Sequence, residues 1–247
     1  MKIGNSSNPA LGKNTLTRVY NSAAADAGQM TINGTVNKMI ISLLLVVIGA
    51  YFSWNQVLAG GGTTLMYAGA ISGFVVAMVT IFKAEWAGYT TPVYAILEGL
   101  FLGGISAYFN QMLPGIVFQA VALTFGVAFT MLFTYRTGLI KASGKFKRGI
   151  IAATGGVAIF YLVSIIGSFF GGGINLFQMG ALGIGIQLVI VVIAALNLIL
   201  DFDRIETMSK QGAPKVMEWY GAFGLMITLV WLYLEILKLL AILSGRD

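Results

Sequence analysis

Seven long apolar stretches constrain this chain more than any other feature of its sequence. Most hold 18 or more residues with few charges. A helix of that length rises about 27 Å at about 1.5 Å per residue, which is enough to cross a bilayer. The separating segments "NQVLAGGG", "NQMLP" and "FGGGINLF" are turn-like. The sequence therefore predicts an all-α integral membrane protein whose seven transmembrane helices span residues 39–58, 65–82, 92–109, 114–135, 149–170, 178–200 and 216–243.

The composition agrees with a membrane protein and excludes several kinds of chemistry. The chain is 57% hydrophobic and only 10% charged, whereas a soluble domain has about 25% charged residues. Histidine and cysteine are absent. Their absence rules out disulfides, thiol nucleophiles, nitrogen- or sulfur-ligated zinc, histidine-ligated haem and a histidine-dependent serine protease. We expect no enzyme and no cofactor, and any metal would need oxygen ligands, which favours calcium or magnesium.

The positions of lysine and arginine predict how the chain is oriented. Thirteen of the 15 basic residues lie in the N-terminal region or in connections on one side, and only Lys238 and Arg246 lie toward the other side. Cytoplasmic loops carry an excess of basic residues, so we expect the N-terminus in the cytoplasm and the C-terminus outside. The net charge of +6 then reports membrane topology, and no nucleic-acid partner is expected.

The N-terminal residues 1–36 differ in composition from the rest of the chain. They are polar and rich in serine, asparagine, alanine and threonine. We interpret them as a mostly disordered cytoplasmic tail. Residues 37–247 then form the seven-helix transmembrane domain.

Glu235 lies well inside the last apolar stretch, in "LVWLYLEILKLLAIL". A carboxylate in hydrocarbon costs at least about 2.5 kcal/mol, so its side chain must face the interior of the helix bundle. Lys238 lies three residues later, within reach for an ion pair on the same helix. A partner on another helix is an equal alternative. A helix that carries such a group is expected to be central in the bundle.

The third stretch carries another acid, Glu98, in "YAILEGLFLGG". It is either a structural carboxyl group, hydrogen-bonded between helices, or part of an ion path. The small-residue spacing of Gly99 and Gly103 predicts a close contact with another helix and nothing more specific.

Asp201 and Asp203 lie in "LNLILDFDRIE", where the sixth stretch ends. They either mark the point at which the helix reaches the cytoplasmic surface or form a polar site. Asn197 favours a polar site, because it lies four residues before Asp201 and shares its helix face.

These residues resemble the Bax inhibitor-1 (transmembrane Bax inhibitor motif) family, in its bacterial branch. The resemblance is carried by "LEGLFLGG", "ILDFDRIE" and "WYGAFGLMITLVWLYLEILKLL". The last is the most specific, because the family typically ends with a Leu-Tyr-Leu-acid-Ile pattern followed by leucines. The resemblance implies six helices around a central, acid-bearing seventh and a pH-sensitive calcium leak. With no targeting segment recognised, it also implies a bacterial inner-membrane protein whose partners are the bilayer and calcium.

In the family, a carboxylate on the sixth helix faces one on the seventh, and the pair acts as a proton-sensitive latch. By position Glu235 matches the seventh-helix acid, with glutamate where the family commonly has aspartate. Asp203 follows an aromatic residue, as the sixth-helix acid does, and Asp201 fits if the register slips. The resemblance thus implies proton sensing, and candidate calcium ligation, by Asp203, Glu235 and Asp201. The candidates for the ion path are Glu98, Asn197 and Lys238.

Helix geometry limits this pairing. If the turn between the last two helices falls near residues 212–214, two straight helices leave the carboxyl groups of Asp203 and Glu235 more than about 10 Å apart in depth. A kink, or a cytoplasmic helical turn within "APKVMEWYG", is needed to bring them level.

The sequence leaves several functions open beside a pH-sensitive calcium leak. A proton-coupled secondary transporter or exchanger would use the same carboxylates, although no inverted repeat supports it. A membrane scaffold that regulates a partner protein is a further alternative. A retinal protein with Lys238 as the attachment point is disfavoured, because the topology is opposite and the third stretch lacks paired aspartates.

Overall fold

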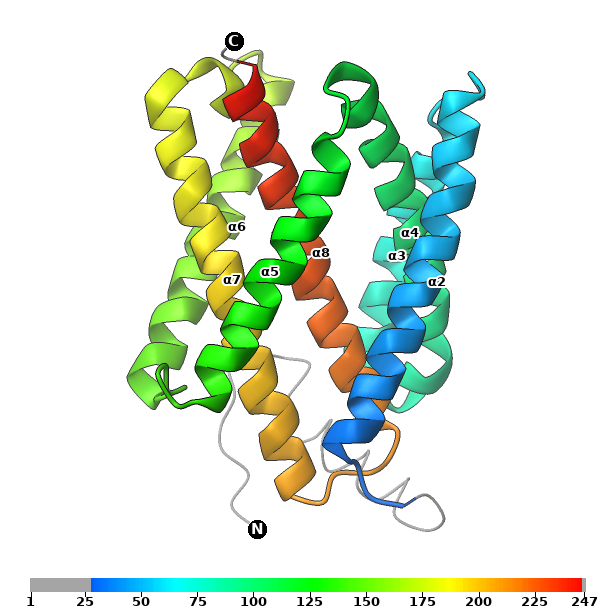
Figure 1. Cartoon of the computed structure of the whole chain (residues 1–247), viewed down its shortest axis with the longest axis vertical. Helices are drawn as coiled ribbons and strands as arrows, with labels where there is room; N and C mark the ends of the chain where they lie inside the picture. Colours follow the sequence, from blue (N-terminus) through cyan, green and yellow to red (C-terminus); the bar gives the residue numbers. More distant parts are fainter. Residues whose placement is uncertain (1–27, 246–247) are drawn as a thin grey trace. The chain divides into compact units, whose positions relative to one another are not determined.

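The computed structural model describes residues 28–245, and in this part of the chain seven helices are long and apolar enough to cross a membrane (Figure 1). The short 3-10 helices η2 (Ala84–Trp86) and η3 (Leu176–Gln178) precede α4 and α7. The prediction of an all-α membrane protein with seven spans is confirmed. The seven are α2 (Ile32–Leu58), α3 (Thr64–Phe82), α4 (Ala87–Met112), α5 (Ile116–Arg136), α6 (Gly144–Phe169), α7 (Gly180–Lys210) and α8 (Met217–Ser244).

Several helices are longer than predicted, and two of the extensions begin at a side-chain cap. The backbone N–H of Gly34 donates to the Thr31 hydroxyl at 2.9 Å, which caps α2 and starts it at Ile32. Ser143 caps α6 in the same way, so the basic run "KFKR" is helical. α7 continues to Lys210, ten residues past its predicted end. Asp201 and Asp203 therefore lie on a helix that continues beyond them.

The predicted polar tail is only partly described. Residues 1–27 lie outside the described residues, so the prediction of disorder there stays a prediction. Residues 32–36 belong to the first turns of α2 rather than to a tail. α4 likewise begins at Ala87, five residues before the predicted start, and Pro92 lies inside it.

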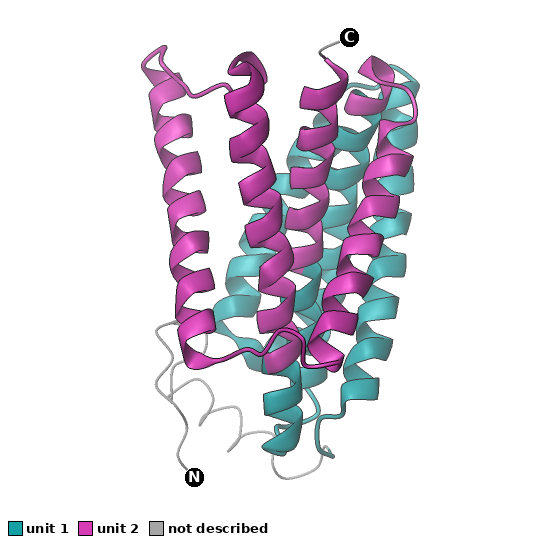
Figure 2. Cartoon of the chain, turned by 60° about the vertical axis from the view of Figure 1, so that its left-hand side comes forward, with its two compact units in different colours: residues 1–108, 204–226 teal, residues 109–203, 227–247 magenta. Residues whose placement is uncertain are grey.

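The chain divides into two compact units (Figure 2). Among the described residues, unit 1 holds 28–108 and 204–226, and unit 2 holds 109–203 and 227–245. α7 and α8 each contribute to both units.

Unit 1 is held together by close approach of α2 and α4. A Cβ atom added at Gly99 would lie 2.3 Å from the Val46 carbonyl oxygen, and one added at Gly103 would lie 2.1 Å from the Ala50 carbonyl oxygen. Real Cβ atoms do not approach that closely, so only glycine fits at both positions. The predicted helix contact at this small-residue spacing is confirmed.

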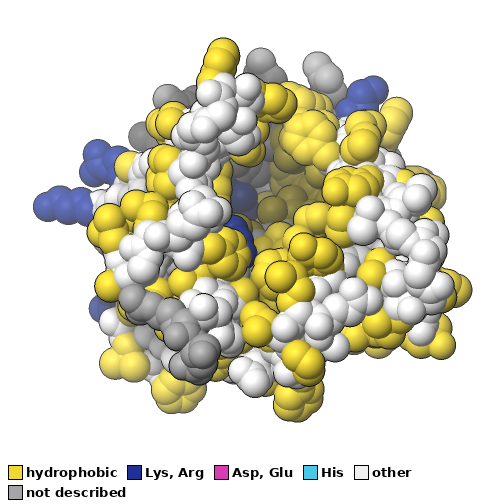
Figure 3. Space-filling view, turned by 90° about the horizontal axis from the view of Figure 1, so that it is seen from above, with side chains coloured by type: hydrophobic (Ala, Val, Ile, Leu, Met, Phe, Trp, Pro, Cys, Tyr) yellow, Lys and Arg dark blue, Asp and Glu magenta, His cyan; other side chains and the backbone are white. Residues whose placement is uncertain are grey.

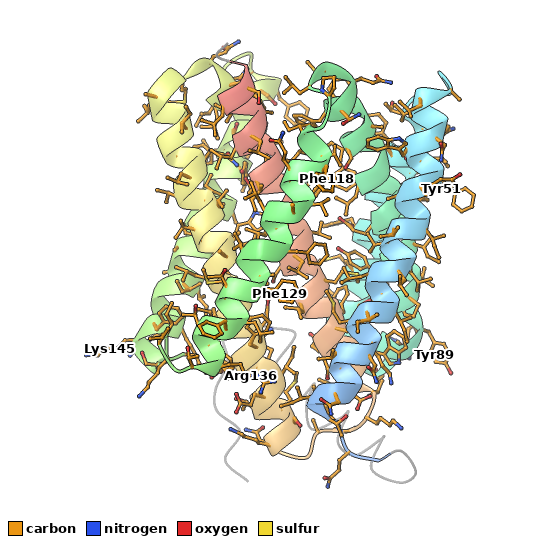
Figure 4. The ribbon with its side chains drawn as sticks, viewed as in Figure 1. Tyr51, Tyr89, Phe118, Phe129, Arg136 and Lys145 are labelled. Atoms are coloured by element: carbon orange, nitrogen blue, oxygen red, sulfur yellow. The ribbon has the colours of Figure 1, made fainter. Side chains whose placement is uncertain are left out.

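Unit 2 is built on α7 and α8, which contribute its largest fully buried apolar side chains: Leu198, Ile199, Leu232 and Leu237. Gln187 and Glu235 are buried with them. α8 is the most buried of the seven helices, at 56% of its apolar window, which agrees with the predicted interior position of the seventh helix. On α5, by contrast, Phe118 and Phe129 are exposed, as lipid-facing residues would be (Figure 4).

Candidate functional site

Glu235 is buried in unit 2, with a side-chain exposure of 2%. Four donors reach its two carboxylate oxygens. Oε1 accepts from the Lys238 ammonium at 2.8 Å and from the Trp231 indole N–H at 3.0 Å. Oε2 accepts from the Tyr161 hydroxyl at 2.7 Å and from the Gln187 amide at 2.7 Å. This is how the chain tolerates a carboxylate inside an apolar helix: a positive charge and three neutral donors replace water.

Three helices supply these donors. Trp231 and Lys238 precede and follow Glu235 by four and three residues on α8, so helix periodicity places both beside the carboxylate. Tyr161 comes from the C-terminal half of α6, and Gln187 from α7. Gln187 also donates to the main-chain oxygen of Glu235 at 2.9 Å. The amide therefore fixes both the backbone and the side chain of Glu235.

Lys238 is bound on two sides. Its ammonium donates to the Tyr161 hydroxyl at 2.8 Å and lies 4.5 Å from the centroid of the same ring. Its side chain remains 30% exposed. Glu235 and Lys238 thus form an ion pair whose net charge is zero, with Tyr161 joining the two.

A cavity of about 530 Å³ reaches this network. Three partners of Glu235 line it, namely Tyr161, Gln187 and Lys238. The rest of the lining comes from the end of α6, the glycine-rich loop after it, η3 and α8: Ser164, Ile165, Ser168, Gly171, Gly173, Ile174, Asn175, Leu176, Phe177 and Ile242. Gly171 has φ +77°, a left-handed conformation that lets the chain turn directly after α6.

Seen from above, hydrophobic side chains are interspersed with other uncharged side chains and backbone (Figure 3). In this view basic side chains are visible, whereas no acidic side chain is seen among the described residues. Glu235 itself is only 2% exposed, and its cavity is lined by the loop that follows α6.

The two aspartates of α7 have other partners. Asp203 forms an ion pair with Lys147, near the start of α6. Asp201 accepts a hydrogen bond from the Thr228 hydroxyl at 2.6 Å. The four side chains that donate hydrogen bonds to the Glu235 carboxylate all come from other residues.

Helix geometry explains the separation. Lys147 contacts Asp203 and Tyr161 contacts Glu235, and these two residues lie fourteen positions apart on α6, or about 21 Å along its axis. Thr228 lies seven residues before Glu235 on α8, about 10 Å along that axis. α7 and α8 are each continuous helices, and the partners of the two α7 aspartates lie at other depths than those of Glu235. These contacts do not support the expectation that an α7 aspartate faces Glu235, which stays a prediction.

The predicted calcium ligands are not gathered at one point. Among residues 28–245, no three acidic side chains lie close enough together to hold a metal ion. Asp201, Asp203 and Glu235 each bond to a different set of partners, as described above. Their assignment as calcium ligands stays a prediction that this arrangement does not support.

The two remaining ion-path candidates each have a partner one turn earlier on their own helix, and Asn197 also has one on α6. Asn197 donates to the Thr154 hydroxyl of α6 and to the Ile193 carbonyl oxygen, both at 2.8 Å. Glu98 belongs to unit 1, where its carboxyl group interacts with the Tyr94 hydroxyl one turn earlier on α4. Glu98 therefore belongs to a different unit from the Glu235 network.

Unit 1 contains a second buried carboxylate, Glu218, which the sequence pattern does not indicate. Glu218 is 2% exposed and accepts from both the backbone N–H and the hydroxyl of Thr31 at 3.0 Å. The Lys38 ammonium lies 3.1 Å from its other oxygen. Glu218 thus ties the first turn of α8 to the first turn of α2.

Some of these partners leave a signal in the sequence and others do not. Trp231 is four residues before Glu235, and helical spacing could have identified it. Gln187 is a lone amide within "GIGIQLVIVV", which is conspicuous in an apolar span. Tyr161 and Glu218 offer no such signal, because one lies in an ordinary aromatic stretch and the other looks like a surface acid at a helix start.

Together the seven apolar helices and the buried ionisable network define a multi-pass membrane protein of α-helical type. A family model described as Bax inhibitor 1 like matches residues 8–245, nearly the whole chain. The chain belongs to this family, as its resemblance predicted. No curated protein matches it.

Proposed function

We propose that this protein is a pH-sensitive cation leak of the Bax inhibitor 1 type, with calcium as the leading ion, and that the charge of Glu235 controls it. The observation that carries the proposal is the buried Glu235 carboxylate whose partners line a cavity of about 530 Å³. Ionisable side chains within membrane spans usually belong to ion or proton pathways. The calcium leak associated with the family supports the choice of ion.

The chemistry of the network suits transient binding of a cation. Its oxygens include the Glu235 carboxylate and the Gln187 amide oxygen, both of which are ligands that calcium accepts, and the Tyr161 hydroxyl lies beside them. With a single carboxylate, this set would hold calcium weakly. Conduction requires an ion to leave as readily as it enters, so weak binding favours a leak over a storage site.

The geometry also fixes the expected sign of the pH dependence. A proton on Glu235 removes the negative charge and leaves the Lys238 ammonium unbalanced. An ammonium and a divalent cation about 5 Å apart repel by roughly 7 kcal/mol at an effective dielectric constant of about 20, and by less where water reaches the ammonium. Protonation also weakens the hydrogen bonds to Glu235, but this loosening is worth only about 1–3 kcal/mol. Electrostatic repulsion dominates, so the leak falls as the pH is lowered.

The orientation proposed here follows the distribution of basic residues. Arg136 and Lys145 lie at one end of unit 2, on either side of the loop between α5 and α6 (Figure 4). With this end in the cytoplasm, the loop after α6 that lines the cavity faces outside. We place the protein in the bacterial inner membrane, with its N-terminus in the cytoplasm and its C-terminus outside.

The test is calcium influx into liposomes that contain the purified full-length protein and a calcium dye, measured from pH 5 to pH 8. Glu235→Gln, Asp203→Asn and empty liposomes are measured in parallel. We expect the parent to show influx that falls with acid, and Glu235→Gln to lose both influx and pH dependence. Asp203→Asn is the matched control, because it removes a carboxylate that pairs with Lys147 instead.

Each alternative result has a clear meaning. No influx above that of empty liposomes at any pH overturns the leak. If Asp203→Asn abolishes the pH dependence while Glu235→Gln keeps it, control belongs to the α7 aspartate. Uphill calcium movement driven by an imposed proton gradient would replace the leak with a proton-coupled transporter.

A further inference from the structure

We propose that Lys238 is a tethered counter-ion that occupies the cation position on Glu235, so that a divalent cation reaches the carboxylate only by displacing the ammonium. This inference rests on the proposed function for the identity of the competitor, a divalent cation. It assigns to Lys238 control of the affinity for that cation by competition for the same carboxylate, without binding the cation itself.

The contacts of Lys238 are those that a bound cation would make. Its ammonium lies 2.8 Å from a carboxylate oxygen and 2.8 Å from the Tyr161 hydroxyl oxygen, beside the ring face. The side chain also lines the cavity. A mobile cation that entered from the cavity would compete for the same oxygens.

The neighbouring amide indicates that the network is arranged for a cation and not for an anion. Gln187 is fully buried, and its Nε2 donates to both the carboxylate and the main-chain oxygen of Glu235. Its Oε1 has no hydrogen-bond partner in the part of the chain that the structure describes. This acceptor belongs to a residue that lines the cavity. A buried acceptor without a donor favours a cation or a donor group as ligand and disfavours an anion.

The reach of Lys238 allows such a displacement. The side chain is 30% exposed and lines the cavity. A lysine stem can swing its ammonium toward water while its carbons stay in place. Removal of the ammonium would leave Glu235 with its negative charge and with the neutral Tyr161 and Gln187 oxygens beside it. The parent site is therefore self-blocked and neutral, and the variant without Lys238 would be an anionic site.

Terbium binding tests this inference independently of transport. Tb³⁺ prefers oxygen ligands as calcium does, and its emission is sensitised by tryptophan and tyrosine nearby, here Trp231 and Tyr161. The full-length parent, Lys238→Gln, Lys238→Arg and the double variant Lys238→Gln/Glu235→Gln are titrated with Tb³⁺ in detergent micelles. We expect Lys238→Gln to lower the half-saturating Tb³⁺ concentration at least about tenfold, because a charge of +1 beside the carboxylate is lost.

The control variants test whether the Tb³⁺ response depends on the positive charge at position 238 and on the Glu235 carboxylate. Lys238→Arg keeps a cation and should bind Tb³⁺ no better than the parent, and the double variant should lose the gain. If Lys238→Gln does not elute and melt as a folded protein, Lys238→Met replaces it, because its unbranched apolar chain keeps the stem volume. Equal Tb³⁺ affinity of the parent and a folded neutral variant overturns the inference, as does a double variant that binds as tightly as Lys238→Gln.

The outcome separates the two proposals. A parent without calcium influx but with a Tb³⁺ response that depends on Lys238 overturns the leak and keeps the counter-ion. A parent that conducts calcium, combined with no effect of Lys238→Gln on Tb³⁺ binding, keeps the leak and overturns the counter-ion.

Discussion

Lys238 follows Glu235 by one helical turn on α8, and its ammonium lies 2.8 Å from the Glu235 Oε1 atom. The Glu235 side chain is 2% exposed and the Lys238 side chain 30% exposed. Leaving the Glu235 charge unpaired would therefore cost more free energy than leaving the Lys238 charge unpaired. Lys238 can recover water by moving toward the cavity, whereas Glu235 is held by donors from three helices. This asymmetry determines what each substitution should do.

Glu235→Gln should destabilise the protein by about 2–4 kcal/mol, toward the lower end of the cost of breaking a buried pair, because the Lys238 side chain is 30% exposed. Four donors point at the two carboxylate oxygens, and a glutamine amide offers only one acceptor. The measurement is the free energy of unfolding in mixed micelles. Adding Lys238→Met should recover part of the loss, since no unpaired charge then remains. A double variant as unstable as the sum of the two single variants would show that the two residues are not coupled.

Tyr161→Phe should cost about 1–2 kcal/mol in the free energy of unfolding, because the hydroxyl donates to Glu235 and accepts from Lys238. The ring would remain, and with it the contact below the ammonium. Tyr89→Phe is the matched control, since Tyr89 is 83% exposed on α4 (Figure 4) and should change stability by less than about 0.5 kcal/mol. Equal effects of the two substitutions would mean that the Tyr161 hydroxyl contributes nothing to the network.

Gly103→Ala should destabilise unit 1 by about 2 kcal/mol or more, because the added Cβ would lie 2.1 Å from the backbone oxygen of Ala50. Backbone cannot move aside as a flexible side chain can, so α2 and α4 would have to separate. Gly88→Ala, on the same helix, is the control: its Cβ would meet Trp219 at an ordinary 3.7 Å. We expect Gly88→Ala to be neutral or stabilising by up to about 1 kcal/mol through helix propensity. The measurement is thermal unfolding of the two variants side by side. If both variants changed stability equally, helix propensity and not the close contact of α2 and α4 would explain the effect.

The spans could be predicted from the sequence because hydropathy and glycine-rich turns are local properties. The predicted helix ends were less accurate where a side-chain cap or a polar extension sets the end of the helix. Thr31 starts α2 within the residues interpreted as a tail, and the segment "DFDRIETMSK" continues α7 although it is polar. Helix formation there depends on side-chain caps and charge pairs, which hydropathy does not record.

The site could be predicted only in part, for a geometric reason. Glu235 and Lys238 could be identified because a charged residue within an apolar stretch stands out in the sequence itself. Their partners on α6 and α7 were not, since the rotation and depth of one helix against another depend on packing across the interface. The same limitation explains why Asp203 seemed a candidate partner of Glu235, although about 21 Å of α6 separates the residues that contact them.

Gly34→Ala should release the start of α2 from the start of α8. The added Cβ would lie 1.9 Å from the Glu218 Oε1 atom, which accepts both hydrogen bonds of Thr31. The carboxylate would have to move, and the capping contacts and the Lys38 ion pair would weaken together. We expect a loss of about 2–4 kcal/mol and faster amide hydrogen exchange over residues 30–36. Gly126→Ala on α5 is the control, because its Cβ would meet nothing within 4 Å. The added Cβ and the Glu218 carboxylate cannot both keep their positions, so the carboxylate must move in a folded Gly34→Ala protein. Unchanged exchange at residues 30–36 would then show that Glu218 does not hold α2 in place.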